Sequence, residues 1–174
     1  MAVLCAKKIH LISKMIIFIK NLKMDKTFEI TINSRNILLQ FLENYSLEQL
    51  NKIPTGFNNN LIWNIGHVVV VQQMLVYKLS GLPMMVSGEM VELYKRGTKP
   101  ERDATPEEVA EIKSLLFVTI DQTGQDFISK TFETYNEFTT MSGFNLKTAE
   151  DAMAFNYYHE AVHTGMMMGI RKFV

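Results

Sequence analysis

Four stretches with apolar residues at helical spacing constrain the fold of this chain more than any other feature. They cover residues 28–45, 59–79, 105–135 and 148 to nearly the end of the chain. Threonine opens the last two, and proline or acidic residues follow it, as is typical of helix starts. No internal repeat, Gly-Ser linker or block of charge divides these stretches. The pattern predicts an all-α protein, an antiparallel four-helix bundle.

Shorter elements are expected between the long helices. A capped helix begins at Ser46 and ends before Pro54, and a helical turn lies around residues 89–94. Residues 138–140 or residues 143–145 are expected to be briefly extended. Two runs, four valines from Val68 and three methionines from Met166, are apolar on nearly all sides of their helices. Such runs indicate a tight core or a dimer interface, and for the methionines we favour the core.

Composition excludes several classes of protein. Hydrophobic residues make up 47% of the 174 residues, which is enough for a core and excludes a disordered or low-complexity chain. Eighteen basic and eighteen acidic residues give no net charge, whereas nucleic-acid binders normally carry a basic excess. Cys5 is the only cysteine, so no internal disulfide forms and a cytoplasmic location is expected. We expect neither a nucleic-acid nor a membrane partner.

Residues 1–23 differ from the rest of the chain. They hold five lysines, no acidic residue and one apolar run, residues 15–19, between two lysines. This run is too short to span a bilayer or to serve as a secretory signal. The segment is interpreted as translation from an upstream start, as an extra amphipathic helix or, least favoured, as a basic membrane-surface helix. The domain proper is expected to comprise residues 24–174.

A pair of histidines on the last helix is the first chemical signal. His159 and His163 are four residues apart, so both side chains lie on one side of a helix and can share a divalent ion. With Glu160 they match H-E-x-x-H, the zinc-protease motif in which the glutamate is the general base. Residues 164–174 contain no Asp, Glu or His. The protease interpretation fails there, and a third ligand must come from upstream.

His67 is the candidate for that third ligand. It lies on the second long helix, four residues after Trp63 and three after Asn64. A lone histidine in this setting is usually a hydrogen-bonded core residue, but two more on a neighbouring helix make it a candidate ligand. Three histidines leave a fourth coordination position for water or substrate, as catalytic zinc sites do.

The two motifs together resemble a known family. Trp63, Gly66 and His67 form W-x-x-G-H, and the last helix carries H-x-x-x-H-x-G. Over roughly residues 25–174 the chain resembles the DinB-like (YfiT-type) superfamily of four-helix bundles. The resemblance implies a homodimer and a divalent ion, zinc or nickel, held by His67, His159 and His163. Members often have glutamine where this chain has Met166, so one polar group near the metal is missing here.

The resemblance also frames the expected activity. Some members are thiol transferases or isomerases that use low-molecular-weight thiols such as bacillithiol, mycothiol or glutathione, and many have no assigned activity. The first hypothesis is a metal-dependent transferase that uses such a thiol on a small-molecule substrate. The alternatives are a metal-dependent hydrolase, with metal-bound water and Glu160 as catalytic base, and a non-enzymatic bundle with a structural or vestigial site. Glu160 lies about 100° round the helix from His159, so a solvent-facing position or a salt bridge within the bundle is an equal interpretation for it. Candidate substrate-pocket residues are Trp63, Asn64 and Tyr158; Asn64 and Tyr158 are expected either to donate hydrogen bonds to a substrate or to be interior residues with satisfied polar tips.

Overall fold

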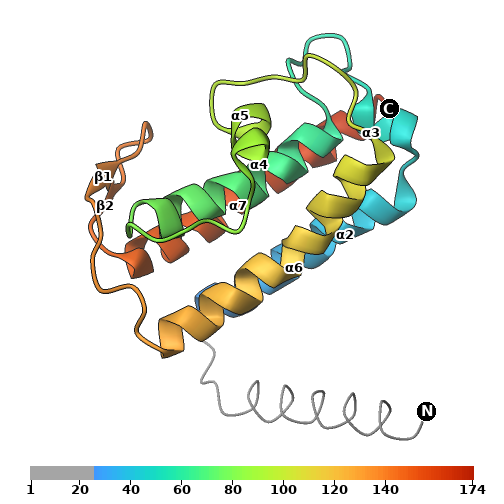
Figure 1. The fold of residues 1–174 in the computed structure, drawn as a ribbon. Helices are drawn as coiled ribbons and strands as arrows, with labels where there is room; N and C mark the ends of the chain where they lie inside the picture. The colour runs from blue at the N-terminus through green and yellow to red at the C-terminus, as the bar shows by residue number, and fades with distance from the viewer. Residues whose placement is uncertain (1–25) are drawn as a thin grey trace, which may run out of the picture.

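The computed structural model describes residues 26–174, which form a helical bundle with one small hairpin (Figure 1). The helices and strands are α2 (Lys26–Asn44), α3 (Leu47–Asn51), α4 (Leu61–Gln73), the π-helical segment η1 (Met74–Lys78), α5 (Gly88–Tyr94), α6 (Pro106–Ile128), β1 (Phe138–Thr139), β2 (Asn145–Leu146) and α7 (Ala149–Ile170). The two strands pair antiparallel, with Phe138 opposite Leu146. Residues 1–23, for which an upstream start or an extra helix is expected, lie outside the described residues.

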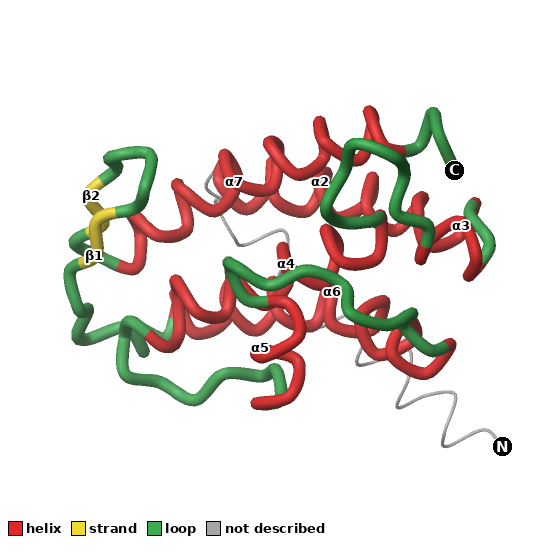
Figure 2. Tube along the Cα trace, turned by 90° about the horizontal axis from the view of Figure 1, so that it is seen from above, coloured by secondary structure: helices red, strands yellow, loops and turns green. Residues whose placement is uncertain are grey.

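Four long helices, α2, α4 with η1, α6 and α7, form the bundle. Helix α2 packs against α6 and α7, and α4 packs against the same two helices (Figures 1 and 2). This confirms the predicted four-helix bundle. Figure 1 shows that α4 and α6 run in one direction and α2 and α7 in the other, so the antiparallel neighbours are α4–α7 and α2–α6. The crossover, residues 79–105 with α5, makes this possible because it returns the chain along the length of the bundle.

The predicted helix starts are confirmed. Ser46, Thr105 and Thr148 each accept a hydrogen bond from the backbone three residues later, and the side chain at that later position reaches back to the cap. Such reciprocal bonds satisfy backbone N–H groups that have no partner within the helix. Strand β1 lies within the expected segment 138–140, whereas β2 overlaps the expected segment 143–145 only at Asn145.

The predicted end of the third long helix is wrong by about two turns. Helix α6 ends at Ile128, not near Tyr135, and Lys130 has a positive φ of 55°. The following residues turn back onto η1: the Tyr135 hydroxyl donates to the carbonyl of Leu75, and Phe132 lies edge-on to Tyr77. These contacts with η1 stabilise a non-helical path after Ile128, although the periodicity of the sequence favours a longer helix.

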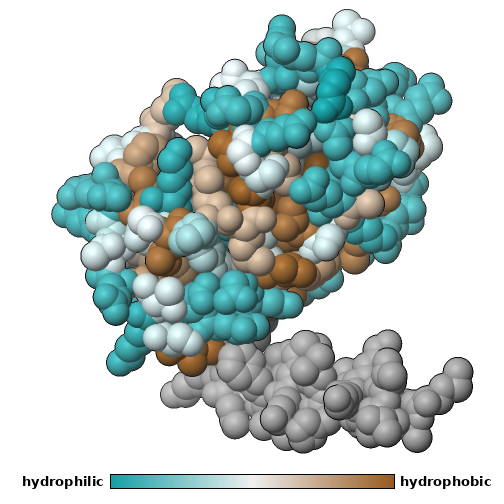
Figure 3. All heavy atoms as spheres, viewed as in Figure 1, coloured by the Kyte–Doolittle hydropathy of each residue, from teal (hydrophilic) through white to brown (hydrophobic). Residues whose placement is uncertain are grey.

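The core explains the two apolar runs. Val68, Val69 and Val70 are fully buried because α4 is covered by α5, α6 and α7. In the second run Met167 is fully buried, whereas Met166 is 39% exposed, so only part of that run belongs to the core. Figure 3 shows hydrophilic residues over most of one face, with apolar side chains visible in its middle. Among residues 26–174 no helix is both long and apolar enough to cross a membrane.

Candidate metal centre

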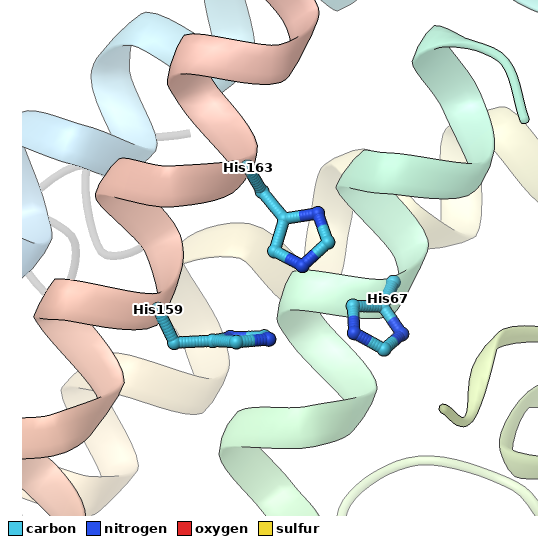
Figure 4. Close-up of side chains that lie close together, drawn as sticks. All are labelled: His67, His159 and His163. Carbon is cyan, nitrogen blue, oxygen red and sulfur yellow. The ribbon is translucent and has the colours of Figure 1, made fainter. Parts of the chain in front are cut away.

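The antiparallel contact between α4 and α7 brings the three predicted histidines together. His67 comes from α4, and His159 and His163 come from successive turns of α7; all three rings point toward one another (Figure 4). One nitrogen from each ring lies within 4.8 Å of the others. The ring centroids are 4.6–5.2 Å apart. Within the described chain, this is the cluster of histidines that can hold a metal ion.

His67 is held by the backbone of α5. Its Nδ1 lies 2.6 Å from the carbonyl oxygen of Tyr94, the last residue of that helix. A carbonyl can only accept a hydrogen bond, so Nδ1 carries the proton and Nε2 keeps its lone pair. Metal-ligating histidines almost always make such a bond through their other nitrogen.

His163 is held in the same way by a side chain. Its Nδ1 lies 2.8 Å from Oδ1 of Asn64, and the amide nitrogen of Asn64 donates to the carbonyl of Asn60 at 2.6 Å. That second bond turns the amide oxygen toward His163, so Nδ1 of His163 donates and Nε2 is free to bind a metal. Asn64, expected in a substrate pocket, is fully buried and serves as this partner.

His159 supplies the test of whether the cluster fits a metal ion. Its Nδ1 is buried and has no hydrogen-bond partner within the described chain, although buried polar atoms are normally paired. Burial lowers the pKa of His159 to about 3, and His163 and His67 beside it add to the lowering. Burial also lowers the pKa of His163, to about 4, and that of His67. Three neutral imidazoles suit zinc, nickel and similar divalent ions, so the residues fit such an ion.

These lowered pKa values predict that the metal-free protein loses stability in mild acid. Below the ordinary histidine pKa of 6.5, unfolded chains take up protons that the folded cluster, with pKa values near 3 and 4, does not. The free energy of unfolding should fall by up to about 1.4 kcal/mol per pH unit for each such histidine. Urea unfolding between about pH 7 and pH 5 measures this slope. In H159Q one fewer proton should be taken up on unfolding, so the slope should be smaller than in the unmodified protein. An unchanged slope would contradict the lowered pKa of His159.

Trp63 lies between the histidines and a cavity. Its ring stacks on His67 with centroids 4.6 Å apart, and its Nε1 donates to Oγ1 of Thr98 at 3.2 Å. It also lines a cavity of about 870 Å³, whose other lining residues include Tyr94, Thr98 and Arg102 but none of the three histidines. Trp63 therefore contacts both the predicted metal ligands and the space beside them.

Glu160 lies away from the role that the H-E-x-x-H motif suggests. Its carboxylate accepts hydrogen bonds from Nε and Nη2 of Arg35 at 2.8–3.0 Å and from the amide of Asn156 at 2.8 Å. Both members of the ion pair are fully buried. The general-base role stays a prediction, and this pairing speaks against it because hydrogen bonds from Arg35 and Asn156 already engage the carboxylate.

Tyr158 is 46% exposed and does not contact the histidines through its ring. It touches Phe144 and Phe155, and Phe155 in turn stacks on His159 with centroids 6.2 Å apart. Of the three expected pocket residues, Trp63 thus contacts the cluster and a cavity, Asn64 holds a ligand, and Tyr158 lies one ring further out.

Sequence reasoning did not identify three contributors to the site. These are the carbonyl of Tyr94, the ion-pair partner Arg35 and the hairpin residue Phe144. Arg35 carried a signal, since it lies on the same face of α2 as the buried residues Thr31, Leu38 and Leu42. A charged residue in a buried stripe predicts a buried partner. A carbonyl carries no signal in its residue type.

Gly66 explains how α5 comes close enough to hold His67. A Cβ at this position would lie 2.5–2.9 Å from ring carbons of Tyr94, well inside van der Waals contact. Because glycine has no Cβ, the space beside its Cα is free for the ring of Tyr94. The W-x-x-G-H motif thus combines a candidate metal ligand, His67, with the gap that admits its hydrogen-bond acceptor.

Replacing Gly66 with alanine is expected to destabilise the protein by about 1–3 kcal/mol through overpacking against Tyr94. Metal affinity should fall too, because the displaced Tyr94 carbonyl no longer holds His67. Gly165 is the matched control: it also lies inside a helix, and a Cβ there meets nothing within 4 Å. G165A should stabilise by up to about 1 kcal/mol. Urea unfolding of both variants checks this, and equal effects would contradict the packing argument.

Comparisons with known proteins agree with the fold and with the motifs. A solved structure described as a conserved protein from Enterococcus faecalis matches with a TM-score of 0.60 and 14% sequence identity, over 88% of this chain and 98% of that one. This likeness supports the fold alone. No curated protein matches the sequence. The profile of the DinB superfamily matches residues 31–167, and the chain therefore belongs to the DinB superfamily.

Proposed function

We propose that this protein binds a divalent ion, zinc or nickel, through His67, His159 and His163 and uses it to transfer a low-molecular-weight thiol. One observation carries the proposal: three neutral imidazoles converge, and two of them are already oriented by hydrogen bonds from Nδ1. Only three protein ligands converge among the described residues. Catalytic zinc sites keep a fourth position open, whereas structural sites close it with protein ligands.

The chain's own residues prepare the site for such chemistry. Tyr94 and Asn64 accept the Nδ1 protons of His67 and His163, which keeps the ligand nitrogens unprotonated and fixes both rings. Trp63 stacks on His67, and Phe155 stacks on His159. A divalent ion, when bound, favours the thiolate form of a thiol, which is the nucleophilic form.

The thiol must come from outside the site. The only cysteine in the sequence is Cys5, so residues 26–174 supply no sulfur nucleophile of their own. A hydrolase is the less favoured alternative because its expected base, Glu160, is engaged by Arg35. Among residues 26–174 no carboxylate joins the histidine cluster.

Two measurements on the full chain test the proposal. Elemental analysis of protein purified without a metal-affinity tag should find about one equivalent of zinc or nickel per chain. The loaded protein should then speed the reaction of glutathione or bacillithiol with a small electrophile, and H67A treated identically should not. Turnover of an ester without added thiol would favour the hydrolase. A protein that rejects added metal would overturn the proposal.

A further inference from the structure

An exposed aromatic cluster lies next to the histidines. It consists of Phe144 from the hairpin and Phe155 and Tyr158 from α7, whose ring centroids are 5.4–5.9 Å apart in all three pairs. Phe144 is 47% exposed and Tyr158 is 46% exposed. Phe155 is partly buried and stacks on His159. The rings thus form a continuous path from the surface to the histidine whose Nδ1 lacks a partner.

The position of Phe144 is fixed by the hairpin and is not that of a loose loop side chain. Its backbone N–H donates to Oγ1 of Thr140 at 3.0 Å, and its carbonyl accepts from the N–H of Thr140 at 2.8 Å. Gly143, with a φ of +84°, makes the tight turn that precedes it. Leu146 anchors the strand in the core at 3% exposure. The backbone that carries Phe144 is therefore already ordered, and binding of an apolar ligand costs little additional loop entropy.

We propose that the aromatic cluster binds the apolar, preferably aromatic, part of the molecule that is bound at the histidine site. This proposal rests on the proposed function, and it names the substrate class: a small molecule with a metal-binding head and an aryl or alkyl group. A whole aromatic side chain has a surface of about 200 Å². Phe144 and Tyr158 each expose about half of theirs, so together they present roughly 200 Å² of aromatic surface. That area matches one phenyl group and falls well short of the roughly 800 Å² per partner of a stable protein interface.

A second copy of this chain is the competing occupant. Val162 and Met166, at 45% and 39% exposure, continue the exposed face of α7 beyond Tyr158. The small-molecule occupant is favoured because the aromatic cluster does not stop at the surface: Phe155 continues it inward onto His159. A subunit interface needs no such continuation.

The test uses pairs of metal-binding probes that differ in a phenyl group. Zinc-loaded full-length protein is titrated in a calorimeter with 2-phenylethanethiol and ethanethiol, and then with benzohydroxamate and acetohydroxamate. The phenyl probe of each pair should bind about 10–100-fold more tightly, the fold-change expected from burying one aromatic ring. F144S and Y158A should each remove most of this preference. F138S is the matched control, since Phe138 is an exposed phenylalanine of the same hairpin without a ring contact to the cluster.

The outcomes separate this proposal from the proposed function. If hydroxamates show the phenyl preference but neither thiol binds, the thiol-transfer function fails and the aromatic subsite stands. If phenyl probes gain nothing, or if the gain survives F144S, the subsite proposal is overturned whatever the thiols do. Sedimentation of F144S and Y158A tests the second copy of the chain as the occupant. If these variants change the number of subunits and keep the phenyl preference, the face is a subunit interface and the proposal is overturned.

Discussion

Replacing His67 with alanine is expected to lower the affinity for zinc by at least roughly a hundredfold. Structural zinc sites bind with about 10–16 kcal/mol shared among four ligands, so each ligand contributes about 3 kcal/mol, or two powers of ten. His67 is the only ligand from α4, and the other two, His159 and His163, both come from α7. Without it, two imidazoles on one helix face remain, and they cannot enclose the ion from the opposite side. Competition with a chromophoric zinc chelator measures the loss.

Two controls accompany the His67 variant. His10, the fourth histidine of the chain, lies outside the described residues, and H10A tests whether removal of any histidine weakens binding. H159A and H163A should each lose zinc affinity to a similar extent, because all three nitrogens belong to one cluster. Full zinc affinity in H67A, with its helical circular dichroism intact, would refute the three-histidine site.

The second large effect is expected at the buried ion pair. Arg35 and Glu160 are both fully buried and share three hydrogen bonds of 2.8–3.0 Å. R35M removes the cation and leaves a carboxylate without compensation in the core, which typically costs 3–5 kcal/mol, about 4 kcal/mol here. The free energy of unfolding from urea titration measures this. The effect is expected in the free energy of unfolding. Zinc affinity should fall only if the substitution displaces α7.

A surface pair provides the comparison for the buried one. Lys113 donates to Glu43 at 2.9 Å, and both side chains are about half exposed, so K113M should cost no more than about 1 kcal/mol. The double variant R35M/E160L removes both buried charges and should recover most of the stability lost in R35M. If R35M and K113M cost the same, the buried pair does not contribute as its geometry indicates.

The sequence predicted the histidine cluster because helical spacing is a local rule. The spacing of four residues from His159 to His163 places both side chains on one face wherever the helix lies, and capping residues such as Thr105 mark helix starts without knowledge of the fold. What escaped prediction depends on contacts between distant segments. The carbonyl of Tyr94 meets His67 across 27 positions, and Arg35 meets Glu160 across 125.

The same limit explains why the roles of Glu160 and Asn64 stayed open between two interpretations. The rotation of about 100° per residue turns Glu160 away from the histidines beside it in the motif, but only the packed structure shows that its partner is Arg35 on α2. An interior role for Asn64 was one of two expectations, and the structure supplies its partner, His163. Spacing along one helix therefore identified which residues gather, while the partner of each polar atom needed the packed structure.

The hydrogen bond between His67 and the end of α5 has a consequence for protein design. The crossover is not a passive linker, because the carbonyl of Tyr94, at the end of its short helix, accepts the Nδ1 proton of the proposed ligand His67. A designer who transplants only α4 and α7 onto another scaffold would carry over three imidazoles and lose the constraint on the tautomer of His67. Shortening the loop for the sake of a simpler bundle would have the same outcome. The smallest portable unit of this centre is therefore the two helices together with the segment that crosses over them.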